Sequence, residues 1–344
     1  MFATIRRIVQ FNKNYRIHVV YDDRRDLNKN DNNIEEIERV KFIRKSEMSR
    51  DDLVRYVNQI RPGIIYFPAW QDKDYFSVIK ILYRKGSKSI LIGGFDDIWH
   101  GSLRQKLGSI YFRIFLLKYF DFAWIAGKPQ YSYVQRFGFK MSQIIGNLYS
   151  ADTNTFSVPK SVKTKRMRRF LFVGRFVNEK GLDVLLKAFD SINSVSKDQW
   201  ELCLIGTGAL AKKLDVYHSE AIIIKPFMQK KELIEELKKG GVCVIPSRKD
   251  QWGLPVHEMA LMGFPIIVSS AVGSASEFVI SGYNGYVFEN ENSESLRLAM
   301  LKIIKLTNSE IECFGERSAS LAQRINSEFS AASFLSVLET SRKN

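Results

Sequence analysis

The sequence predicts an α/β protein with two domains, each built around a parallel β-sheet. Short apolar runs of strand type alternate with helix-like segments along most of the chain, and this alternation is typical of βαβ units. The length of 344 residues suits two domains of ordinary size. A basic segment around Pro159 lacks periodicity and separates the two halves. We therefore expect a domain at 1–158, a linker at 159–169, a second domain at 170–325 and a terminal helical segment at 326–344.

The composition is that of a soluble globular protein, with 45% apolar and 26% charged residues. The richest apolar stretch, Leu107 to Ala126, is interrupted by charged side chains, so we expect no transmembrane helix. The first residues lack the apolar core of a signal peptide. Cys203, Cys243 and Cys313 show no metal or disulfide spacing, which indicates core residues of a reduced cytoplasmic protein.

The net charge of +15 is concentrated in the first half. Residues 1–165 hold 29 Lys and Arg against 16 Asp and Glu, whereas residues 166–344 hold 23 against 21. A basic first domain suggests an anionic partner, and the inner leaflet of a bacterial membrane or a lipid-diphosphate acceptor would fit. Nucleic acid is the rival partner, but no helix-turn-helix, RNP-type or zinc-binding pattern supports it. A basic surface that serves only solubility is the remaining alternative.

The first half opens with a helix rather than a strand. Apolar residues at helical spacing begin the chain, and residues 15–21 then alternate like a strand. A domain of nucleotide-binding type usually opens with a strand and a glycine-rich turn, and neither precedes this helix. Further strands are expected at 40–43, 63–67, 89–92 and 122–126, and helices at 51–60, 75–84, 104–120 and 127–138.

The expected helix at 104–120 combines aromatic bulk with basic residues. Docking onto lipid headgroups agrees with this composition. Burial as a core helix is the alternative, and we expect burial because a strand follows directly at 122–126.

Polar residues gather just after the expected strand at 89–92, namely Asp96, Asp97 and His100. The carboxyl ends of parallel strands form the functional edge of such a sheet. Carboxylates there can bind sugar hydroxyls, and His100 can exchange a proton near neutral pH. A structural loop histidine is the alternative for His100. We expect no metal at the two aspartates, since adjacent carboxylates without further ligands usually form a turn or a cap.

The second half continues the same alternation of strands and helices. Strands are expected at 170–173, 201–205, 221–225, 242–245 and 265–269; helices are expected from about 180, at 230–239, from about 254 and from 293 onward, with a last helix near 329–338. Two of these strand–turn–helix segments have the form that binds phosphorylated ligands.

In the first such segment a strand ends at Gly174 and a helix begins near Lys180. The planar guanidinium of Arg175 and the ammonium group of Lys180 can reach the same diphosphate. In the second segment Gly253 precedes an apolar helix, and the carboxylates Asp250 and Glu258 lie eight residues apart, one in the loop and one in the helix. That spacing lets both carboxylates face one crevice at the carboxyl end of the strand.

The segment 244–260 resembles the signature of the family 4 (group 1) retaining glycosyltransferases, in which an acidic residue, seven others and a Glu bracket an aromatic-Gly-Leu turn. Asp250 stands where Glu is commoner. The block Phe172–Gly181 resembles the same family's phosphate-binding loop. The resemblance covers most of residues 168–300 and the first half only loosely. It implies the GT-B fold: two Rossmann-like parallel-sheet domains that face a central cleft, with a C-terminal helix that crosses back to the first domain.

The resemblance implies an acceptor-binding first domain and a second domain that binds a nucleotide-diphosphate sugar. Three residues are expected to act in catalysis: Arg175 and Lys180 on the donor's pyrophosphate, and Asp250 on hydroxyls of the transferred sugar. Other donor-binding residues are Gly174, which with Gly181 permits close backbone approach, and Gly206 and Gly208, which form a small-residue turn into a helix. Phe227 is expected near the base, Gly253 and Leu254 would offer N–H groups to the phosphates, and Glu258 would bind the ribose hydroxyls. Asp96, Asp97 and His100 are candidates for the acceptor side.

The resemblance, together with the basic first half, implies a retaining, metal-independent, cofactor-free hexosyltransferase. It would extend a lipid-linked acceptor or a polysaccharide such as lipopolysaccharide, and we expect it to be peripheral on the cytoplasmic face of the plasma membrane. The family generally has an opening strand and glycine loop near the acceptor. Either this subgroup does without them or the N-terminus is shortened. Two alternatives remain: a glycosyltransferase-like binding subunit that turns over poorly, and a GT-B nucleotide-sugar epimerase. The sequence does not disclose the sugar, the base or the acceptor.

Overall fold

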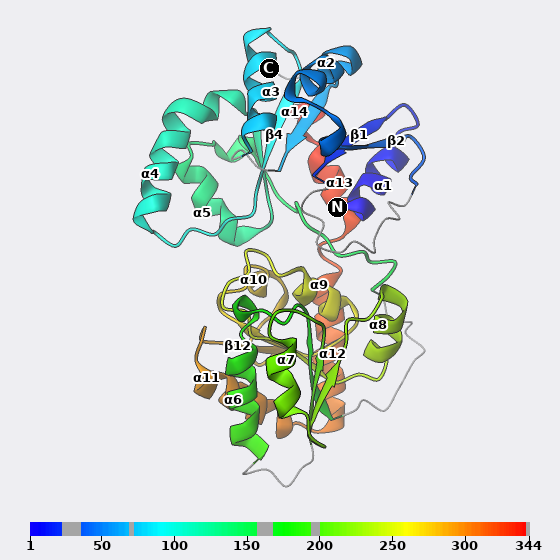
Figure 1. Cartoon of the computed structure of the whole chain (residues 1–344), viewed down its shortest axis with the longest axis vertical. Coiled ribbons are helices and arrows are strands. Elements are labelled where there is room, and N and C mark those ends of the chain that lie inside the picture. The colour runs from blue at the N-terminus through cyan, green and yellow to red at the C-terminus, as the bar shows by residue number, and fades with distance from the viewer. Residues whose placement is uncertain (23–35, 69–71, 157–167, 194–199, 342–344) are drawn as a thin grey trace. The chain divides into compact units, whose positions relative to one another are not determined.

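The computed structural model describes residues 1–22, 36–68, 72–156, 168–193 and 200–341. The chain divides into two compact units (Figure 1): unit 1 contains Met1–Ser150 and Ser327–Asn344, and unit 2 contains Ala151–Asn326. Residues 159–167 of the expected linker lie outside the described residues. No helix within the described ranges has the length and apolar character needed to cross a bilayer.

Unit 1 begins with a helix, as the periodicity predicted. This helix, α1 (Phe2–Phe11), buries Ile5, Ile8 and Val9. The strands β1 (Ile17–Tyr21) and β2 (Val40–Arg44) follow and pair in parallel as a separate two-stranded sheet.

A four-stranded parallel sheet in the order β3-β4-β5-β6 forms the core of unit 1. Its strands are β3 (Ile64–Phe67), β4 (Ile90–Phe95), β5 (Phe122–Ile125) and β6 (Ile144–Ile145), and the helices around it are α2 (Arg50–Ile60), α3 (Lys73–Arg84) and α5 (Lys128–Arg136). The helix α2 begins with a capping box, in which Ser49 and Asp52 exchange side-chain and backbone hydrogen bonds. Because all strands run parallel, the residues that follow β4 lie at one edge of the sheet.

The segment that we expected as one buried helix at 104–120 is divided, and only one side of it is buried. It contains α4 (Leu103–Tyr111), a π-helical turn η3 (Phe112–Leu116) and a 3₁₀ turn η4 (Leu117–Tyr119). Phe112 stacks on Phe137 with ring centroids 4.3 Å apart, and Leu116 and Phe120 are buried as well. The expectation of burial was wrong for the outer side of the segment. Apolar residues occupy both of its sides, but only one side packs against the rest of unit 1.

The C-terminal helices α13 (Ser327–Leu335) and α14 (Val337–Ser341) belong to unit 1. Phe334 lies against Trp124 of β5, with ring centroids 5.1 Å apart. The hydroxyl of Thr4 in α1 donates to the hydroxyl of Ser330 at 3.2 Å. The predicted return of the C-terminal segment to the first half of the chain is therefore confirmed.

Unit 2 contains a six-stranded parallel sheet in the order β12-β11-β10-β7-β8-β9. Its strands are β7 (Arg169–Val173), β8 (Glu201–Ile205), β9 (Ile222–Lys225), β10 (Val242–Ile245), β11 (Ile266–Ser269) and β12 (Gly285–Phe288). The chain builds outward from β7 to β9 and then returns to the other side of β7 with β10. The order of strands therefore reverses between β7 and β10, which is the topological switch point of the sheet.

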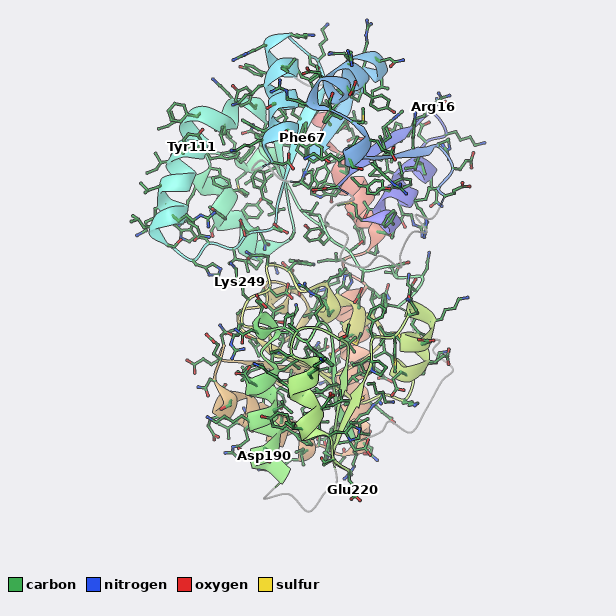
Figure 2. All side chains as sticks on the ribbon, in the orientation of Figure 1. Arg16, Phe67, Tyr111, Asp190, Glu220 and Lys249 are labelled. Carbon is green, nitrogen blue, oxygen red and sulfur yellow. The ribbon has the colours of Figure 1, made fainter. Side chains whose placement is uncertain are left out.

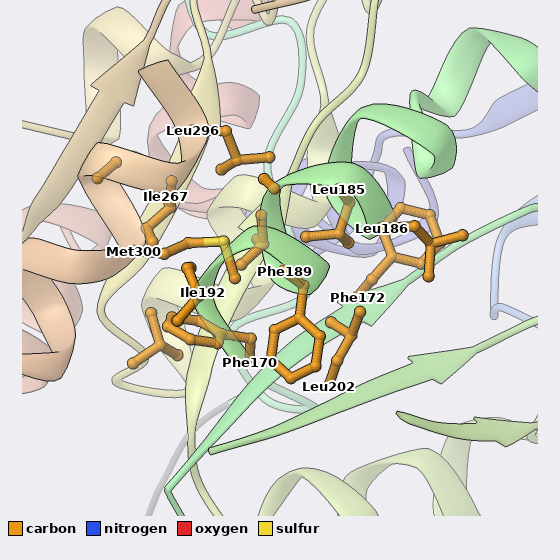
Figure 3. Close-up of a cluster of buried hydrophobic side chains, with 14 of the residues drawn as sticks. Phe170, Phe172, Leu185, Leu186, Phe189, Ile192, Leu202, Ile267, Leu296 and Met300 are labelled. Carbon is orange, nitrogen blue, oxygen red and sulfur yellow. The ribbon is translucent and has the colours of Figure 1, made fainter. Parts of the chain in front are cut away.

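The helices of unit 2 are α6 (Leu182–Asn193), α7 (Ala211–Leu214), α8 (Lys230–Leu237), α9 (Leu254–Leu261), α10 (Ala275–Phe278), α11 (Ser293–Ile304) and α12 (Asn308–Ala322). Figure 3 shows the main core, in which Phe189 of α6 and Met300 of α11 lie beside Phe170 of the sheet. All three side chains are fully buried. Truncating an aromatic residue at such a position to Ala costs about 3–5 kcal/mol, so this cluster fixes the sheet that carries the loops described below.

A buried ion pair fixes the start of β7. Arg169, the last residue of the expected linker, is the first residue of the strand, and its Nη1 lies 2.6 Å from Oε1 of Glu236 in α8. Burial alone would raise the pKa of Glu236, but hydrogen bonds from Arg169, Lys225 and Lys239 lower the pKa to about 2. Among the cysteines, Cys203 and Cys243 are buried in β8 and β10, where we expected them.

Candidate functional site

The loops that follow β7 and β10 leave neighbouring strands at the same edge of the sheet of unit 2. Val242 of β10 pairs with Phe170 of β7 in parallel, so Gly174 and Pro246 follow the strands in the same direction. Lys249, labelled in Figure 2, belongs to the second loop. In a doubly wound sheet the ligand crevice lies outside the carboxyl ends of the two strands at the switch point. The two sequence motifs therefore come together where this architecture binds its ligands.

Glycines allow these loops to pack backbone against backbone. Gly181 has a left-handed φ of +65°, and a Cβ at this position would overlap the carbonyl oxygen of Pro246 in the neighbouring loop. A Cβ on Gly206, which follows β8, would overlap the carbonyl oxygen of Gly174. Gly208 lies in the same way against the backbone of the loop after β7. The expected close backbone approach at Gly181 agrees with its contact with Pro246, whereas a Cβ on Gly174 would meet only the side chain of Phe172.

Lys180 and Asp250 form an ion pair across the two loops. The Nζ atom of Lys180 lies 2.6 Å from Oδ2 of Asp250, and each side chain is 19% exposed. A charge-assisted hydrogen bond with this little exposure to water is one of the stronger kinds in proteins. The sequence predicted both residues for the site with different ligands, a diphosphate and sugar hydroxyls. The structure places the two side chains in direct contact, so a ligand of either would lie next to the other.

Arg175 supplies a second cation after β7. Its side chain is exposed and makes no hydrogen bond or ion pair with the described residues. A guanidinium without a counter-charge beside a glycine-rich loop attracts an anion, and its planar fork matches the oxygens of a phosphate. In the same described part of the chain, no group of three or more His, Cys, Asp or Glu side chains is placed to hold a metal ion. The metal-independent route stays a prediction.

Arg248 joins the two loops and was not among the predicted site residues. Its Nη1 and Nη2 atoms donate to the two carboxylate oxygens of Asp183 at 2.8 and 2.6 Å, and its Nε donates to Glu291 at 2.8 Å. Nη1 also donates to the carbonyl oxygen of Asn178 at 2.7 Å. The hydrogen bonds to Asp183 and then to Glu291 raise the pKa of Arg248. Asp183 and Arg248 are 65 residues apart, so no short sequence pattern reveals this contact.

The N-terminus of α9 is built on Gly253, which has a left-handed φ of +79°. A Cβ on Gly253 would overlap the side chain of Val272. Ser274 fixes the turn, because its hydroxyl donates to the Gly253 carbonyl at 3.0 Å and its N–H donates to the Trp252 carbonyl at 2.7 Å. The N–H groups of the first helical turn, which starts at Leu254, have no partners within the helix. This turn is therefore held in a shape that presents donors to an anion.

Glu258 lies on α9, about one turn after its start. Burial raises the pKa of Glu258 to about 7, and the positive charge of Lys230 partly opposes this rise. Both protonation states are therefore populated near neutral pH. The ionised carboxylate can accept hydrogen bonds from two neighbouring hydroxyl groups of a ligand.

His257, the neighbour of Glu258, connects α9 to both ends of unit 2 and was not predicted as a functional residue. Its Nδ1 accepts from the N–H of Ala151 at 3.0 Å, so the proton lies on Nε2, which donates to the carbonyl of Ala322 at 3.0 Å. The ring stacks on Phe278 with centroids 4.3 Å apart. Burial lowers the pKa of His257 to about 4. The residue is a neutral structural link within unit 2.

Phe227 follows β9 and is 55% exposed. It lies at the same edge of the sheet as Gly206, because β8 and β9 are neighbouring parallel strands. An exposed aromatic ring at this edge offers a surface on which a planar base can stack.

The three acceptor-side candidates all lie in unit 1, after β4. Asp96 accepts a hydrogen bond from the Tyr149 hydroxyl at 3.0 Å, and burial followed by the Asp96 charge raises the pKa of Tyr149. Asp97 and His100 are exposed, and the backbone N–H of His100 donates to the Gln105 side chain at 2.8 Å. Asp96 therefore has a structural partner, while Asp97 and His100 present polar groups at the surface of unit 1.

Comparisons with known proteins show which family these loops resemble. Residues 154–318 match the family model described as glycosyl transferases group 1. A curated relative, the uncharacterized glycosyltransferase MJ1178 of Methanocaldococcus jannaschii, is 32% identical over 166 residues, which cover 46% of this chain and 44% of the relative. The matches span less than half of the length of the curated relatives.

Solved structures resemble the fold of nearly the whole chain. Sucrose-phosphate synthase from Thermosynechococcus elongatus has a TM-score of 0.77 at 15% identity, covering 99% of this chain and 93% of that chain. The Anabaena protein Alr3699/HepE, in complex with UDP and glucose, has a TM-score of 0.65 at 16% identity, covering 88% of this chain and 86% of that chain. The chain therefore has the GT-B fold, and its residues 154–318, which carry the Lys180–Asp250 pair, match the family model of the group 1 glycosyl transferases.

Proposed function

We propose that this chain is a glycosyltransferase that takes its sugar from a nucleoside-diphosphate sugar bound to unit 2. The observation that carries the proposal is the Lys180–Asp250 pair at the switch point, with 2.6 Å between its charged atoms. It puts a cation and a carboxylate side by side between loops whose N–H groups suit an anion. A ligand with both phosphate and hydroxyl groups matches this combination. The likeness to the Anabaena protein with UDP and glucose supports the same class of donor.

The diphosphate of the donor would lie between Arg175, Lys180 and the first turn of α9. Each charge-assisted hydrogen bond to the diphosphate is worth about 1.5–3 kcal/mol. The positive end of the α9 dipole adds to this attraction. Arg248 does not contact the donor in this proposal, because it is engaged by Asp183 and Glu291. It holds the two loops at the separation that the diphosphate requires.

The carboxylates would bind the hydroxyl groups on either side of the diphosphate. Asp250 would accept hydrogen bonds from the transferred sugar, and Glu258 would accept them from the ribose. Phe227 would stack on the base. The identities of the sugar and the base depend on contacts beyond these residues.

Transfer would break the bond between the anomeric carbon and the diphosphate oxygen, and form a bond from that carbon to an acceptor hydroxyl oxygen. The acceptor's proton would pass to the departing diphosphate on the same face of the sugar, so that the anomeric configuration is retained and no protein nucleophile is needed. Arg175 and Lys180 would stabilise the negative charge that develops on the diphosphate. With these cations in place the reaction would proceed without a metal ion or a cofactor.

The acceptor would be bound by unit 1 through the loop that holds Asp97 and His100. We place the acceptor among lipid-linked or polysaccharide chains, as in the synthesis of lipopolysaccharide or other cell-surface polymers. The support is the charge of the first half, in which residues 1–165 hold 29 Lys and Arg against 16 Asp and Glu. Such a half suits an anionic membrane surface and a lipid diphosphate. The protein would then act on the cytoplasmic face of the plasma membrane as a peripheral enzyme.

The test is the release of nucleoside diphosphate from a panel of nucleotide sugars, with and without membrane extract. We expect one donor to be consumed, with faster turnover when the extract supplies the acceptor. Lys180→Ala should reduce the acceptor-dependent turnover by at least about tenfold. Lys187→Ala, which removes an exposed lysine of α6, is the matched control and should leave turnover unchanged.

The same panel separates the alternatives. A binding subunit would raise its melting temperature with one donor, because a ligand stabilises the state it binds, yet would release no nucleoside diphosphate. An epimerase would convert its donor with no acceptor present. Either result would contradict the transferase proposal.

A further inference from the structure

Unit 1 exposes a continuous apolar surface on α4 and η3. It consists of six side chains that are each between 52% and 72% exposed: Leu103, Leu107, Ile110, Tyr111, Ile114 and Phe115. Figure 2 labels Tyr111 among the side chains that project from this segment. On an ideal helix Leu103, Leu107 and Ile110 fall within an arc of about 60°, so they form one stripe. We call the six residues the α4 face.

The α4 face does not hold the segment on unit 1. That role belongs to the opposite side, where Phe112 and Leu116 are buried and Phe112 stacks on Phe137. An exposed apolar patch of this size is unfavourable in water and marks an interaction surface. Substitutions on the α4 face should therefore leave the fold of unit 1 intact.

The charged residues of the segment that carries the α4 face are all of one sign. Arg104, Lys106, Arg113 and Lys118 are exposed, and residues 98–120 contain no Asp or Glu. None of the four forms an ion pair with the part of the chain that the structure describes. On the same ideal helix Arg104 and Lys106 lie on the two borders of the apolar stripe. An apolar stripe with basic borders is typical of helices that lie in the headgroup region of an anionic membrane.

We propose that the α4 face docks unit 1 on an anionic lipid bilayer, with α4 lying along the membrane surface. The apolar side chains would enter the boundary between headgroups and acyl chains, and the four cations would meet lipid phosphates. Charge complementarity selects this occupant. A second copy of the chain would place its own four positive charges opposite the four of the first copy, and these charges would repel each other. An anionic bilayer instead supplies both the apolar layer and the counter-charges.

The docked helix would also position the acceptor loop. α4 begins at Leu103, directly after the loop that holds Asp97 and His100. The Gln105 side chain of α4 donates to the carbonyl of Ile98 at 2.7 Å and accepts from the N–H of His100 at 2.8 Å. Docking would therefore hold this loop at the level of the headgroups, where a lipid-linked acceptor presents its sugar. This consequence rests on the function proposed above, whereas the docking itself does not.

Vesicle sedimentation with the full chain, in the absence of nucleotide sugar, tests the docking. We expect the protein to bind vesicles that contain phosphatidylglycerol and not vesicles of phosphatidylcholine alone. The double variant Leu107→Gln and Ile110→Gln should lose binding, and Arg104→Glu with Lys106→Glu should weaken it by more than about tenfold. Val216→Gln, at an 81% exposed site of unit 2, and Lys88→Glu, at an exposed site of unit 1, are the matched controls.

Melting temperatures of all variants should match that of the natural chain, since the altered residues are exposed. Absence of binding to the phosphatidylglycerol vesicles, or equal binding by the natural chain and both double variants, would overturn the proposal. A dimer that the Leu107→Gln and Ile110→Gln changes dissociate, with no vesicle binding, would assign the surface to a second copy instead. Because the vesicle test uses no donor, lost docking with intact release of nucleoside diphosphate would leave the transferase proposal standing.

Discussion

The Nζ atom of Lys180 and the Oδ2 atom of Asp250 lie 2.6 Å apart, although 70 residues separate them in the chain. The contact exists because Lys180 follows β7 and Asp250 follows β10, and these strands are neighbours at the point where the sheet reverses its order. The sheet topology thus turns two separate motifs into one polar centre.

Lys180→Ala should reduce kcat/KM for the donor by about 10-fold to 150-fold, which corresponds to the 1.5–3 kcal/mol of a charge-assisted hydrogen bond. Steady-state kinetics with the donor identified in the panel would measure this change. Because the change also removes the ion pair with Asp250, the melting temperature should fall, and the kinetics should be measured well below the unfolding transition. A kcat/KM equal to that of Lys187→Ala would remove Lys180 from the site.

Arg248→Lys should raise the donor KM several-fold with a smaller change in kcat. Lysine keeps the charge but loses the two-pronged contact with Asp183, so the loops should hold their separation less well. Asp183→Asn should have a similar effect. The combined variant should be less impaired than the sum of the single ones by about 1 kcal/mol, as measured by a double-mutant cycle. Strict additivity would show that the Arg248–Asp183 contact plays no part in positioning.

Glu258 should make the protein less stable as the pH rises from about 4.5 to about 7. The unfolded carboxyl loses its proton near pH 4.5, whereas burial raises the folded pKa to about 7. In this window the folded state binds more protons, so the free energy of unfolding falls with rising pH, by up to about 3 kcal/mol. Urea unfolding at pH 5 and pH 8 measures the effect. Glu258→Gln should remove this part of the pH dependence; an unchanged difference between the two pH values would show that Glu258 does not cause it.

His257 should act with the opposite sign. Its folded pKa is about 4 against 6.5 in the unfolded chain, so the stability that it contributes is present above pH 6.5 and is lost as the pH falls toward 4. Between about pH 4.5 and 6.5 the effects of His257 and Glu258 oppose each other. His257→Asn should lower stability overall, through lost packing on Phe278, but should remove the acid-induced loss. If the variant lost stability below pH 6 as steeply as the natural chain, another group would be responsible.

Local sequence patterns predicted the elements of unit 2 well. Residues 201–205 and 242–245 form β8 and β10 with the expected bounds, because continuous apolar runs between turn residues have few alternatives to a buried strand. The glycines at 206 and 253 helped to identify the loops, because Gly206 lies against the backbone of Gly174 and Gly253 has a left-handed φ.

Contacts between distant residues could not be predicted in this way. Arg248 looks like an ordinary loop arginine until the fold brings Asp183 to it, and His257 looks like part of an apolar helix until Ala151 and Ala322 meet its ring. The expected burial of the helix at 104–120 rested on the strand that follows it directly at 122–126. Only the packing around Phe112 shows which side faces the protein.

The return of α13 and α14 to unit 1 makes unit 2 an insertion within the fold of the other unit. Residues 151–326 form one uninterrupted piece of chain, whereas unit 1 is assembled from both ends, with Thr4 hydrogen-bonded to Ser330. A gene fragment for residues 151–326 can therefore encode one compact unit without a break in the chain. To produce unit 1 alone, residue 150 must be joined to residue 327 by an artificial linker. Deleting the last eighteen residues would remove part of unit 1, although most of that unit lies at the other end of the sequence.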